Sequence, residues 1–335
     1  MIDPVDNFEI PAEWIKRAST PLDELELRIS SGRYFLLSDG SLLRRGFTTG
    51  TTAAAAAKAA VLSLKGDISE VSVPTPVGIR AFLPVHAKNG KASAIKDSGD
   101  HAFDVTSGIE IHAEAKENET ILIKAGSGIG SKNGKPAINP SPMRQIEDSI
   151  KEALLETKLR GAFVTISIPK GKEVAKKTLN EKIGIIGGLS ILGTTGFVEP
   201  WNEHLGETKE ELIDKADKVV LTTGRIGLRF SNMLFPGYTV ILIGSDISRG
   251  LAAAKGEVII CGLPGLILKW AKADILKNSG YLTIQEMIDA NPQNPIIDRA
   301  LDEAVKVSGK RIVLLNRNGT ILRDSSDISY PEGTL

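Results

Sequence analysis

The chain has 335 residues, a length that predicts two domains, each able to bury a core of its own. Lysine plus arginine and aspartate plus glutamate number 41 each, so no global charge draws the chain to nucleic acid or to an anionic membrane. The single cysteine, Cys261, excludes an internal disulfide and any metal site built from several cysteines. The acidic first segment lacks a signal-peptide pattern, and no apolar run reaches the roughly 20 residues of a membrane span, so a cytoplasmic, soluble protein is expected.

The first half of the chain predicts helices scattered among antiparallel hairpins. Helices are expected at Ala12–Ala18, Pro21–Ile29 and Ser141–Lys158. Strands are expected at Tyr34–Leu37, Ser41–Leu43, Glu70–Val73, Ile79–Pro84, Ala92–Lys96, Ile109–Ala115, Thr120–Lys124 and Val164–Ile168. Turn signals such as Asp39-Gly40 separate these strands. The mixture indicates an α+β domain over residues 1–178.

The second half changes to continuous apolar runs rich in β-branched residues, a pattern typical of buried parallel strands. These runs are Lys218–Leu221, Thr239–Ile243, Val258–Cys261 and Arg311–Leu315. Helical stretches are expected between them at Leu205–Lys215, Ile226–Leu234, Leu266–Leu276 and Ile296–Val307. Strand–helix alternation predicts a three-layer α/β (Rossmann-like) domain over residues 179–335.

The segment Leu43–Ala60, LRRGFTTGTTAAAAAKAA, combines two arginines, a threonine cluster and an alanine run. Threonines cap helix starts well, and alanine is the strongest helix former. A helix start directs its unpaired N–H groups and positive dipole end outward, so this one is predicted to bind a carboxylate or phosphate beside Arg44 and Arg45. The alternative is a tightly packed alanine helix with an ordinary threonine cap.

Glycine clusters suggest where a ligand approaches the backbone. Gly126–Gly130 is not a Walker loop, because Ile129 occupies the required glycine position. The Gly224–Gly227 turn follows a buried strand, which suits either a ligand turn or a plain strand-to-helix connection. The segment GIIGGLSILGTTG, Gly184–Gly196, holds five glycines in thirteen residues, which favours a ligand loop over a structural bend.

Acidic residues crowd into KDSGDHAFD, which contains Asp97, Asp100, His101 and Asp104. One interpretation is a metal or general-base site, and the other is a hydrated loop whose acids cap turns. From the spacing alone the loop is favoured, because no pattern such as HExxH is present.

Several segments resemble the CbiD family of cobalt-precorrin-5B C1-methyltransferases. They are RYFLLSDGSLLRRGFTTGTTAAAAAKAA, IKDSGDHAFDVTSG, GKPAINPSP and IPKGKEVAKKTLNEKIGIIGGLSILGTTGFVEP, in that order. The resemblance runs from about Arg33 to the C-terminus and weakens after Gly262. It implies methyl transfer from S-adenosylmethionine to C1 of cobalt-precorrin-5B, giving cobalt-precorrin-6A in anaerobic cobalamin biosynthesis. The cobalt would arrive inside the tetrapyrrole substrate, so no protein-bound metal is expected.

If the reaction is methyl transfer to a corrinoid, the chemistry of particular residues suggests their roles. The residues expected to hold the carboxylates of the corrinoid are Arg44, Arg45, Thr48, Thr49 and Lys58. The methyl donor is expected in the C-terminal domain, with its adenosyl group near Gly224 and Gly227. The residues expected to cover its methionine end are Gly187, Gly188, Thr194, Thr195 and Gly196. The candidates for a catalytic base are Asp104, His101 and Glu199.

Three departures from the family pattern qualify the resemblance. Thr52 replaces a common cysteine, and Ser131-Lys132-Asn133 replaces a longer loop. In Cys261–Gly280, Leu263 stands where the family has a histidine, and its Asn-Thr-His-Ser piece is absent. A corrinoid-binding pathway protein with altered or no methyltransferase activity is therefore the alternative. Either protein is compatible with an oligomer.

Overall fold

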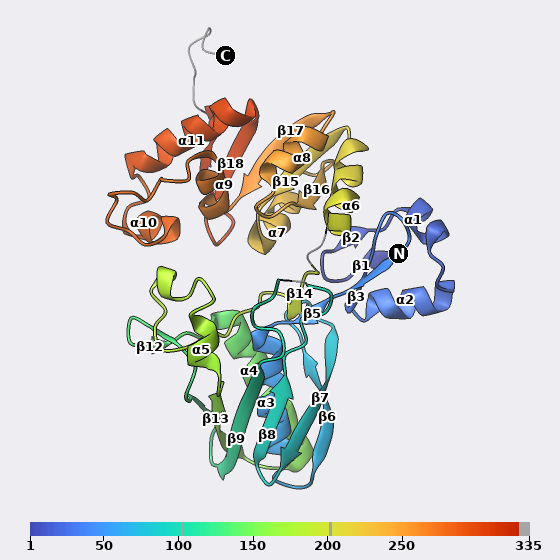
Figure 1. Cartoon of the computed structure of the whole chain (residues 1–335), viewed down its shortest axis with the longest axis vertical. Helices are drawn as coiled ribbons and strands as arrows, with labels where there is room; N and C mark the ends of the chain where they lie inside the picture. The colour runs from blue at the N-terminus through green and yellow to red at the C-terminus, as the bar shows by residue number, and fades with distance from the viewer. Residues whose placement is uncertain (102, 201–202, 328–335) are drawn as a thin grey trace. The chain divides into compact units, whose positions relative to one another are not determined.

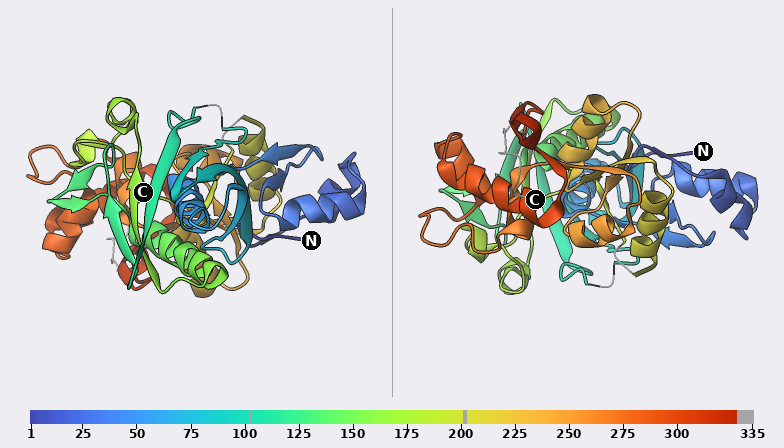
Figure 2. Two further views of the ribbon diagram at one scale, coloured as in Figure 1. Left: turned by 90° about the horizontal axis from the view of Figure 1, so that it is seen from below. Right: turned by 90° about the horizontal axis from the view of Figure 1, so that it is seen from above.

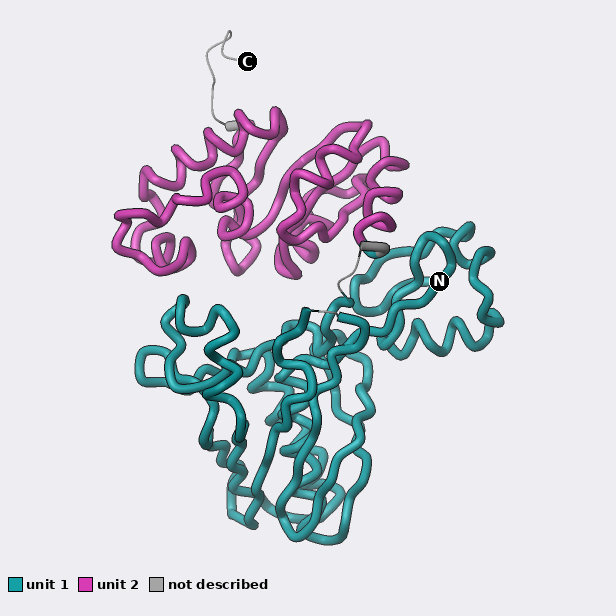
Figure 3. Tube along the Cα trace, in the orientation of Figure 1, with its two compact units in different colours: residues 1–205 teal, residues 206–335 magenta. Residues whose placement is uncertain are grey.

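The computed structural model of the chain describes residues 1–101, 103–200 and 203–327. The chain divides into two compact units, Met1–Leu205 and Gly206–Leu335 (Figure 3). The division lies well after residue 178, where the change of sequence pattern led us to expect it. Both units mix helices and strands, so the predicted mixed α/β character is confirmed.

The first unit is built on a six-stranded sheet with the strand order β10-β13-β9-β8-β7-β6 (Figure 1). Its strands are β6 (Ile68–Pro74), β7 (Arg80–Lys88), β8 (Lys91–Ile95), β9 (Glu110–Asn118), β10 (Leu122–Ala125) and β13 (Gly161–Ser167). All neighbours are antiparallel except β10 and β13, which run parallel. Strand β7 alternates strictly between exposed and buried residues, which gives the sheet one face toward the core.

Helix α3 (Thr49–Leu62) fills that core. Every residue from Thr49 to Val61 is buried, because the helix packs against strands of the sheet on one side and against α4 (Pro140–Thr157) on the other. Seen along its axis, α3 lies inside the curve of the sheet (Figure 2). Alanine side chains are small enough to let strands and helix approach closely from all sides.

The N-terminal residues add a small layer to this unit. Its elements are β1 (Ile2–Asp3), β2 (Phe8–Glu9), α1 (Ala12–Arg17), α2 (Leu22–Ser30), β3 (Tyr34–Leu36) and β4 (Leu42–Arg44). Trp14, Leu25 and Ile29 are fully buried and hold the two helices in place. The expected hairpin forms between β3 and β4, and Gly40 adopts a left-handed φ of 87° in its turn.

Residues 179–200 belong to the first unit and not, as expected, to the C-terminal one. Isolated bridges join Ile129 to Leu189 and Ile138 to Ile191, and β14 (Phe197–Val198) pairs with β5 (Gly46–Phe47). The remaining short elements here are β11 (Ser131–Lys132), β12 (Lys135–Pro136), α5 (Gly171–Ala175) and the 3₁₀ turn η1 (Glu181–Ile183). Backbone pairing with earlier residues thus moves the division to Leu205.

The second unit contains a five-stranded sheet with the order β16-β15-β17-β18-β19. Its strands are β15 (Lys218–Thr222), β16 (Thr239–Leu242), β17 (Glu257–Gly262), β18 (Arg311–Leu315) and β19 (Ile321–Asp324). The first four are parallel and β19 is antiparallel to β18. The continuous apolar runs predicted this buried parallel sheet correctly.

Helices pack on both faces of this sheet. They are α6 (Glu203–Asp214), α7 (Arg225–Leu234), α8 (Ile247–Ala253), α9 (Pro264–Ala271), α10 (Ile284–Ala290) and α11 (Pro295–Ser308), followed by the 3₁₀ turn η2 (Ser325–Asp327). Phe230 of α7 packs against Val220 and Ile259 on one face, whereas Ile297 of α11 shares a core with Ile312 on the other. No helix in the described part of the chain has the length and apolar character needed to cross a membrane.

Candidate functional site

The start of α3, which we expected to bind an anion, is closed by the protein itself. Thr48 is the N-cap, and its hydroxyl accepts a hydrogen bond from the N–H of Thr51 at 3.1 Å. The N–H of Gly50 donates to the carbonyl of Leu192 at 3.0 Å, and the Thr49 hydroxyl accepts from the N–H of Leu192 at 2.9 Å. These partners occupy the N–H groups of Gly50 and Thr51, which favours the alternative of a capped, packed helix.

The glycine-rich loop supplies those partners, and its glycines make room for the protein's own atoms. A Cβ on Gly193 would lie 2.4 Å from the Thr48 hydroxyl oxygen, and a Cβ on Gly188 would lie 2.2 Å from the carbonyl oxygen of Gly128. The carbonyl of Gly196 accepts from the Thr51 hydroxyl at 2.7 Å. Gly188 and Gly193 are therefore needed for close packing within the protein, which favours the structural bend at these two positions, and a ligand at the exposed part of the loop stays a prediction.

Most of the residues expected to cover the donor are thereby engaged within the first unit. Thr195 is buried, and its hydroxyl donates to the carbonyl of Phe197 at 3.0 Å. Gly187 and Thr194 remain exposed. Because the loop lies in Met1–Leu205, it is not part of the unit that carries Gly224 and Gly227.

Arg45 is enclosed and cannot meet a substrate. Its side chain is 0% exposed, and its guanidinium binds both carboxylate oxygens of Asp3 at 3.0 and 3.1 Å and the carboxylate of Asp6 at 2.8 Å. The group also lies over the ring of Phe35. We therefore correct its expected role from substrate binding to anchoring of the N-terminal segment.

Lys58 is likewise structural. It lies buried in α3, about two and a half turns after the helix start. Its ammonium donates to Glu152 at 2.7 Å and to the carbonyl of Ser72 at 3.0 Å. Arg80 binds the same carboxylate at 2.8 Å. The Arg80 hydrogen bond, followed by that of Lys58, lowers the pKa of Glu152 to about 2 against the opposing effect of burial.

Arg44 is the arginine that stays accessible, with a side chain 38% exposed. Its guanidinium and that of Arg33 share the carboxylate of Asp97, which Arg33 meets at 2.6 Å. Arg33 in turn lies 4.0 Å from the centre of the Phe47 ring. Burial would raise the pKa of Asp97, but the N–H of Gly99 and the two arginines hold it below its usual value. A second carboxylate, that of Asp100, accepts from the backbone N–H of Arg44 at 2.6 Å, so two arginines and two aspartates meet here.

The sequence pointed to Arg44 but missed Arg33 and Asp97 as its neighbours. The signal was present in part, because both lie in segments that resemble the family. Sequence spacing could not reveal the contact, since Arg33 and Asp97 are brought together only by the fold.

Two of the three candidate bases remain. Asp104 forms an ion pair with the buried Lys96 and accepts hydrogen bonds from Thr106. Burial would raise the pKa of Asp104, but Lys96 and Thr106 lower it overall, so the carboxylate is a paired anion and a poor base. The Nδ1 atom of His101 accepts from the N–H of Phe103 at 3.2 Å. Glu199 lies half-buried directly after β14.

In the second unit, two turns lie side by side at the carboxyl end of the parallel sheet. One follows β15 and contains Thr223 and Gly224, and the other begins at Gly262, the last residue of β17. A Cβ on Gly262 would lie 2.9 Å from the Thr223 hydroxyl oxygen, which shows how closely the turns approach. Strand β16 lies on one side of β15 and β17 on the other, so the strand order reverses here. Such a switch point is where ligands bind in open α/β sheets.

Gly224, Gly227 and Thr222 lie at this switch point, and they differ in the space or hydrogen bond that they can offer to a ligand. Gly224 adopts an extended backbone at the start of α7, and a Cβ there would meet nothing within 4 Å. Gly227 is different, because a Cβ there would lie 2.1 Å from the Thr222 hydroxyl oxygen. Gly227 is therefore needed for packing of α7 on the sheet. The Thr222 hydroxyl is buried and has no hydrogen-bond partner among the described residues.

Other features of the family segments can now be placed. Leu263, which replaces the family histidine, is the N-cap of α9 and follows directly on the second turn. Cys261 is buried in β17, and burial raises the pKa of its thiol to about 11. Within the described ranges, no group of three or more His, Cys, Asp or Glu side chains is placed to hold a metal ion.

Comparison with known proteins places these features in a family. The model of the CbiD family matches residues 37–200. A cobalt-precorrin-5B C(1)-methyltransferase of Methanococcoides burtonii is 56% identical over 336 residues, with 98% of this chain and 99% of the relative covered. The chain belongs to the CbiD family.

Two further CbiD relatives support the assignment over nearly the whole length. A cobalt-precorrin-5B C(1)-methyltransferase of Methanosarcina acetivorans is 55% identical, with 97% of this chain and 99% of the relative covered. The crystal structure of the cobalamin biosynthesis protein cbiD from Archaeoglobus fulgidus is similar with a TM-score of 0.78 and 40% sequence identity. That likeness covers 94% of this chain and 100% of the other, so this CbiD chain shares its fold with a solved relative.

Proposed function

We propose that this protein transfers a methyl group from S-adenosylmethionine to C1 of cobalt-precorrin-5B in cobalamin biosynthesis. The observation that carries the proposal is the near full-length identity to relatives named for that reaction, at 56% and 55%. The proposed setting is the cytoplasm, with a tetrapyrrole substrate and without nucleic acid or a membrane as partner. The cobalt belongs to the substrate.

We place the methyl donor at the switch point of the second unit. The residues there fit such a group, because Gly224 leaves open space at the start of α7 and Thr222 carries a buried hydroxyl without a partner. The N-cap of α7, Gly224, offers no side-chain cap, so the N–H groups of Ile226 and Gly227 in the first turn can bind an oxygen of the ligand. When bound, the donor supplies a methyl group activated by a sulfonium.

The roles proposed for the chain are binding and orientation. The turn at Thr223 and Gly224 would fix the donor, and the Arg33–Arg44 pair would hold a carboxylate of the corrinoid, since arginine suits carboxylates through its forked donors. Positioning two reactants in line can supply several kcal/mol of the barrier. His101 and Glu199 remain the proposed acceptors of a proton.

A binding measurement separates this proposal from its alternative. Gly224→Val places a side chain in open space on an extended backbone, so the unit should fold while its turn is blocked. The matched control is Gly66→Val, because a Cβ on Gly66 also meets nothing within 4 Å. Calorimetry with S-adenosylhomocysteine should show binding to the parent and the control and a large loss in Gly224→Val.

The outcomes have distinct meanings. Unchanged affinity in a folded Gly224→Val protein would overturn the placement of the donor. A parent that binds no donor but does bind the corrinoid would favour the non-methylating pathway protein, for which Leu263 in place of the family histidine is the motivating observation. Incubation of the parent with cobalt-precorrin-5B and labelled S-adenosylmethionine tests the reaction itself.

A further inference from the structure

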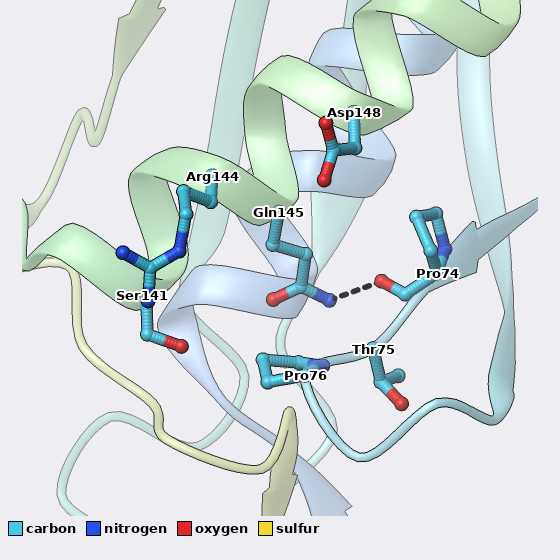
Figure 4. A pocket seen from close by; sticks show the side chains of 7 residues that line it. All are labelled: Pro74, Thr75, Pro76, Ser141, Arg144, Gln145 and Asp148. Carbon is cyan, nitrogen blue, oxygen red and sulfur yellow. Dashed lines mark hydrogen bonds between the residues drawn. The ribbon is translucent and has the colours of Figure 1, made fainter.

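A small pocket of about 190 Å³ lies in the first unit between α4 and the turn that follows β6 (Figure 4). One wall is a stripe of α4 side chains one turn apart, and the other is the turn containing Pro74, Thr75 and Pro76. The stripe consists of Ser141, Arg144, Gln145 and Asp148. A polar wall thus faces a largely apolar one. No residue of this pocket has a role in the site described above.

Gln145 presents an acceptor to the pocket. The side chain is only 4% exposed, and its amide nitrogen donates to the carbonyl of Pro74 at 2.9 Å. A carbonyl only accepts, so the nitrogen must face Pro74 and the carboxamide oxygen must face the other way. Figure 4 shows that oxygen on the side where Ser141 and Arg144 lie.

This carboxamide oxygen lacks a good donor from the protein. Its near neighbour is the Thr51 hydroxyl at 3.4 Å, beyond the usual hydrogen-bond length. That hydroxyl already donates its proton to the carbonyl of Gly196 at 2.7 Å. A buried acceptor in this state is stabilised by a ligand that donates a hydrogen bond.

The charges on either side of Gln145 are opposite. Arg144 is exposed and has no ion-pair partner among the residues that the structure describes. Asp148 lies one turn further along and binds Lys151 at 2.9 Å through one carboxylate oxygen, on the exposed side of the helix. The guanidinium of Arg144 can therefore bind an acidic group of a ligand. The carboxylate of Asp148 and the carboxamide oxygen of Gln145 can bind a basic group.

The size and the chemistry together define the ligand. Sites for drug-sized molecules occupy about 300–1,000 Å³, so this pocket takes a small head group and not a macrocycle. A lone carboxylate would satisfy Arg144 but would meet Asp148 with the wrong charge. We propose that the pocket binds an α-amino-acid head group, whose carboxylate pairs with Arg144 and whose ammonium donates to Gln145 and Asp148.

Two sources can supply this head group: a free amino acid, or the methionyl part of a methyl donor that binds in this pocket and not at the switch point of the second unit. Only the second source rests on the proposed function. The Thr51 hydroxyl accepts from the Gln145 amide at 3.1 Å and donates to the carbonyl of Gly196 at 2.7 Å. Two hydrogen bonds therefore link the pocket to Gly184–Gly196, a segment that resembles the family.

The test is calorimetry on the full chain with L-methionine, S-adenosylhomocysteine and propionate. Arg144→Gln should weaken L-methionine binding on the order of tenfold or more, because a charge-assisted hydrogen bond is lost. Asp148→Asn should weaken L-methionine but not propionate. The matched control is Arg160→Gln, since Arg160 is exposed and lies in the same unit away from the pocket.

Each result decides something. If Arg144→Gln weakens L-methionine and S-adenosylhomocysteine alike, the donor binds in this pocket, and its proposed placement at the switch point of the second unit is wrong. If it weakens only L-methionine, the pocket is an amino-acid site separate from methyl transfer, and the proposal holds even where the proposed function fails. The proposal of an amino-acid site would be overturned if L-methionine failed to bind the parent. It would also be overturned if propionate bound equally well to the parent, Arg144→Gln and Asp148→Asn.

Discussion

Replacement of Arg45 tests whether this arginine anchors the fold or binds substrate. In Arg45→Met the charge is lost and the aliphatic bulk is kept, so the carboxylate of Asp3, which is 0% exposed, remains buried without its partner. Removal of one member of a buried ion pair costs about 3–5 kcal/mol. For a unit of this size, each kcal/mol lowers the unfolding midpoint by roughly 2–4 °C, which gives a fall of about 6–20 °C.

The assay is thermal and urea unfolding followed by circular dichroism. Arg160→Met is the matched control, because its exposed pair with Glu119 contributes at most about 1 kcal/mol. Adding Asp3→Asn to Arg45→Met should recover part of the loss, since the buried charge is removed while the Asp3 side-chain oxygen still accepts from the N–H of Val5. A midpoint within 2 °C of the parent, together with weaker corrinoid binding, would refute the reasoning and restore Arg45 to the substrate site.

Three further predictions follow from the charges and the thiol. Glu152 has a pKa lowered from 4.5 to about 2, so it stabilises the fold above about pH 4.5 by about 2–3 kcal/mol, and this contribution disappears as the pH falls toward 2. The difference in unfolding free energy between the parent and Glu152→Gln should therefore shrink by about half from pH 7 to pH 3, and a constant difference would contradict the pairing. Arg44→Gln should raise the Michaelis constant for the corrinoid on the order of tenfold and leave donor affinity unchanged, and equal losses in both would indicate a folding defect. Cys261 should resist iodoacetamide at pH 8 in the native protein and react after unfolding in guanidinium, because burial raises its thiol pKa to about 11; rapid native labelling would show that β17 is open.

The elements were largely predictable because their signals are local. Periodic burial in β7, β-branched runs in β15 and β17, and the threonine that starts α3 all follow from neighbours in the sequence. The division between the units was not predictable in this way. It depends on β-bridges between residues far apart in the sequence, such as Ile129 and Leu189, and no local sequence pattern predicts these bridges.

The site was less predictable, because a charged residue in the sequence does not reveal its partner. Arg45 and Lys58 were predicted to bind the substrate from their charge. In the fold, Arg45 pairs with Asp3 and Lys58 pairs with Glu152. Glycine has the same ambiguity. A dense glycine segment predicts close approach, but only the fold tells whether the approaching atoms belong to a ligand or, as at Gly193, to Thr48.

The enclosure of α3 has a consequence for how mutations in this protein should be interpreted. A helix surrounded on every side has no surface on which a larger side chain can be accommodated, so even Ala55→Leu would force strands apart. Tolerance to substitution should therefore be lowest in α3 because of packing alone, whether or not the helix takes part in ligand binding. A mutational scan scored by activity would single out the alanines as strongly as true contact residues, and only a parallel measurement of folded protein would tell the two apart.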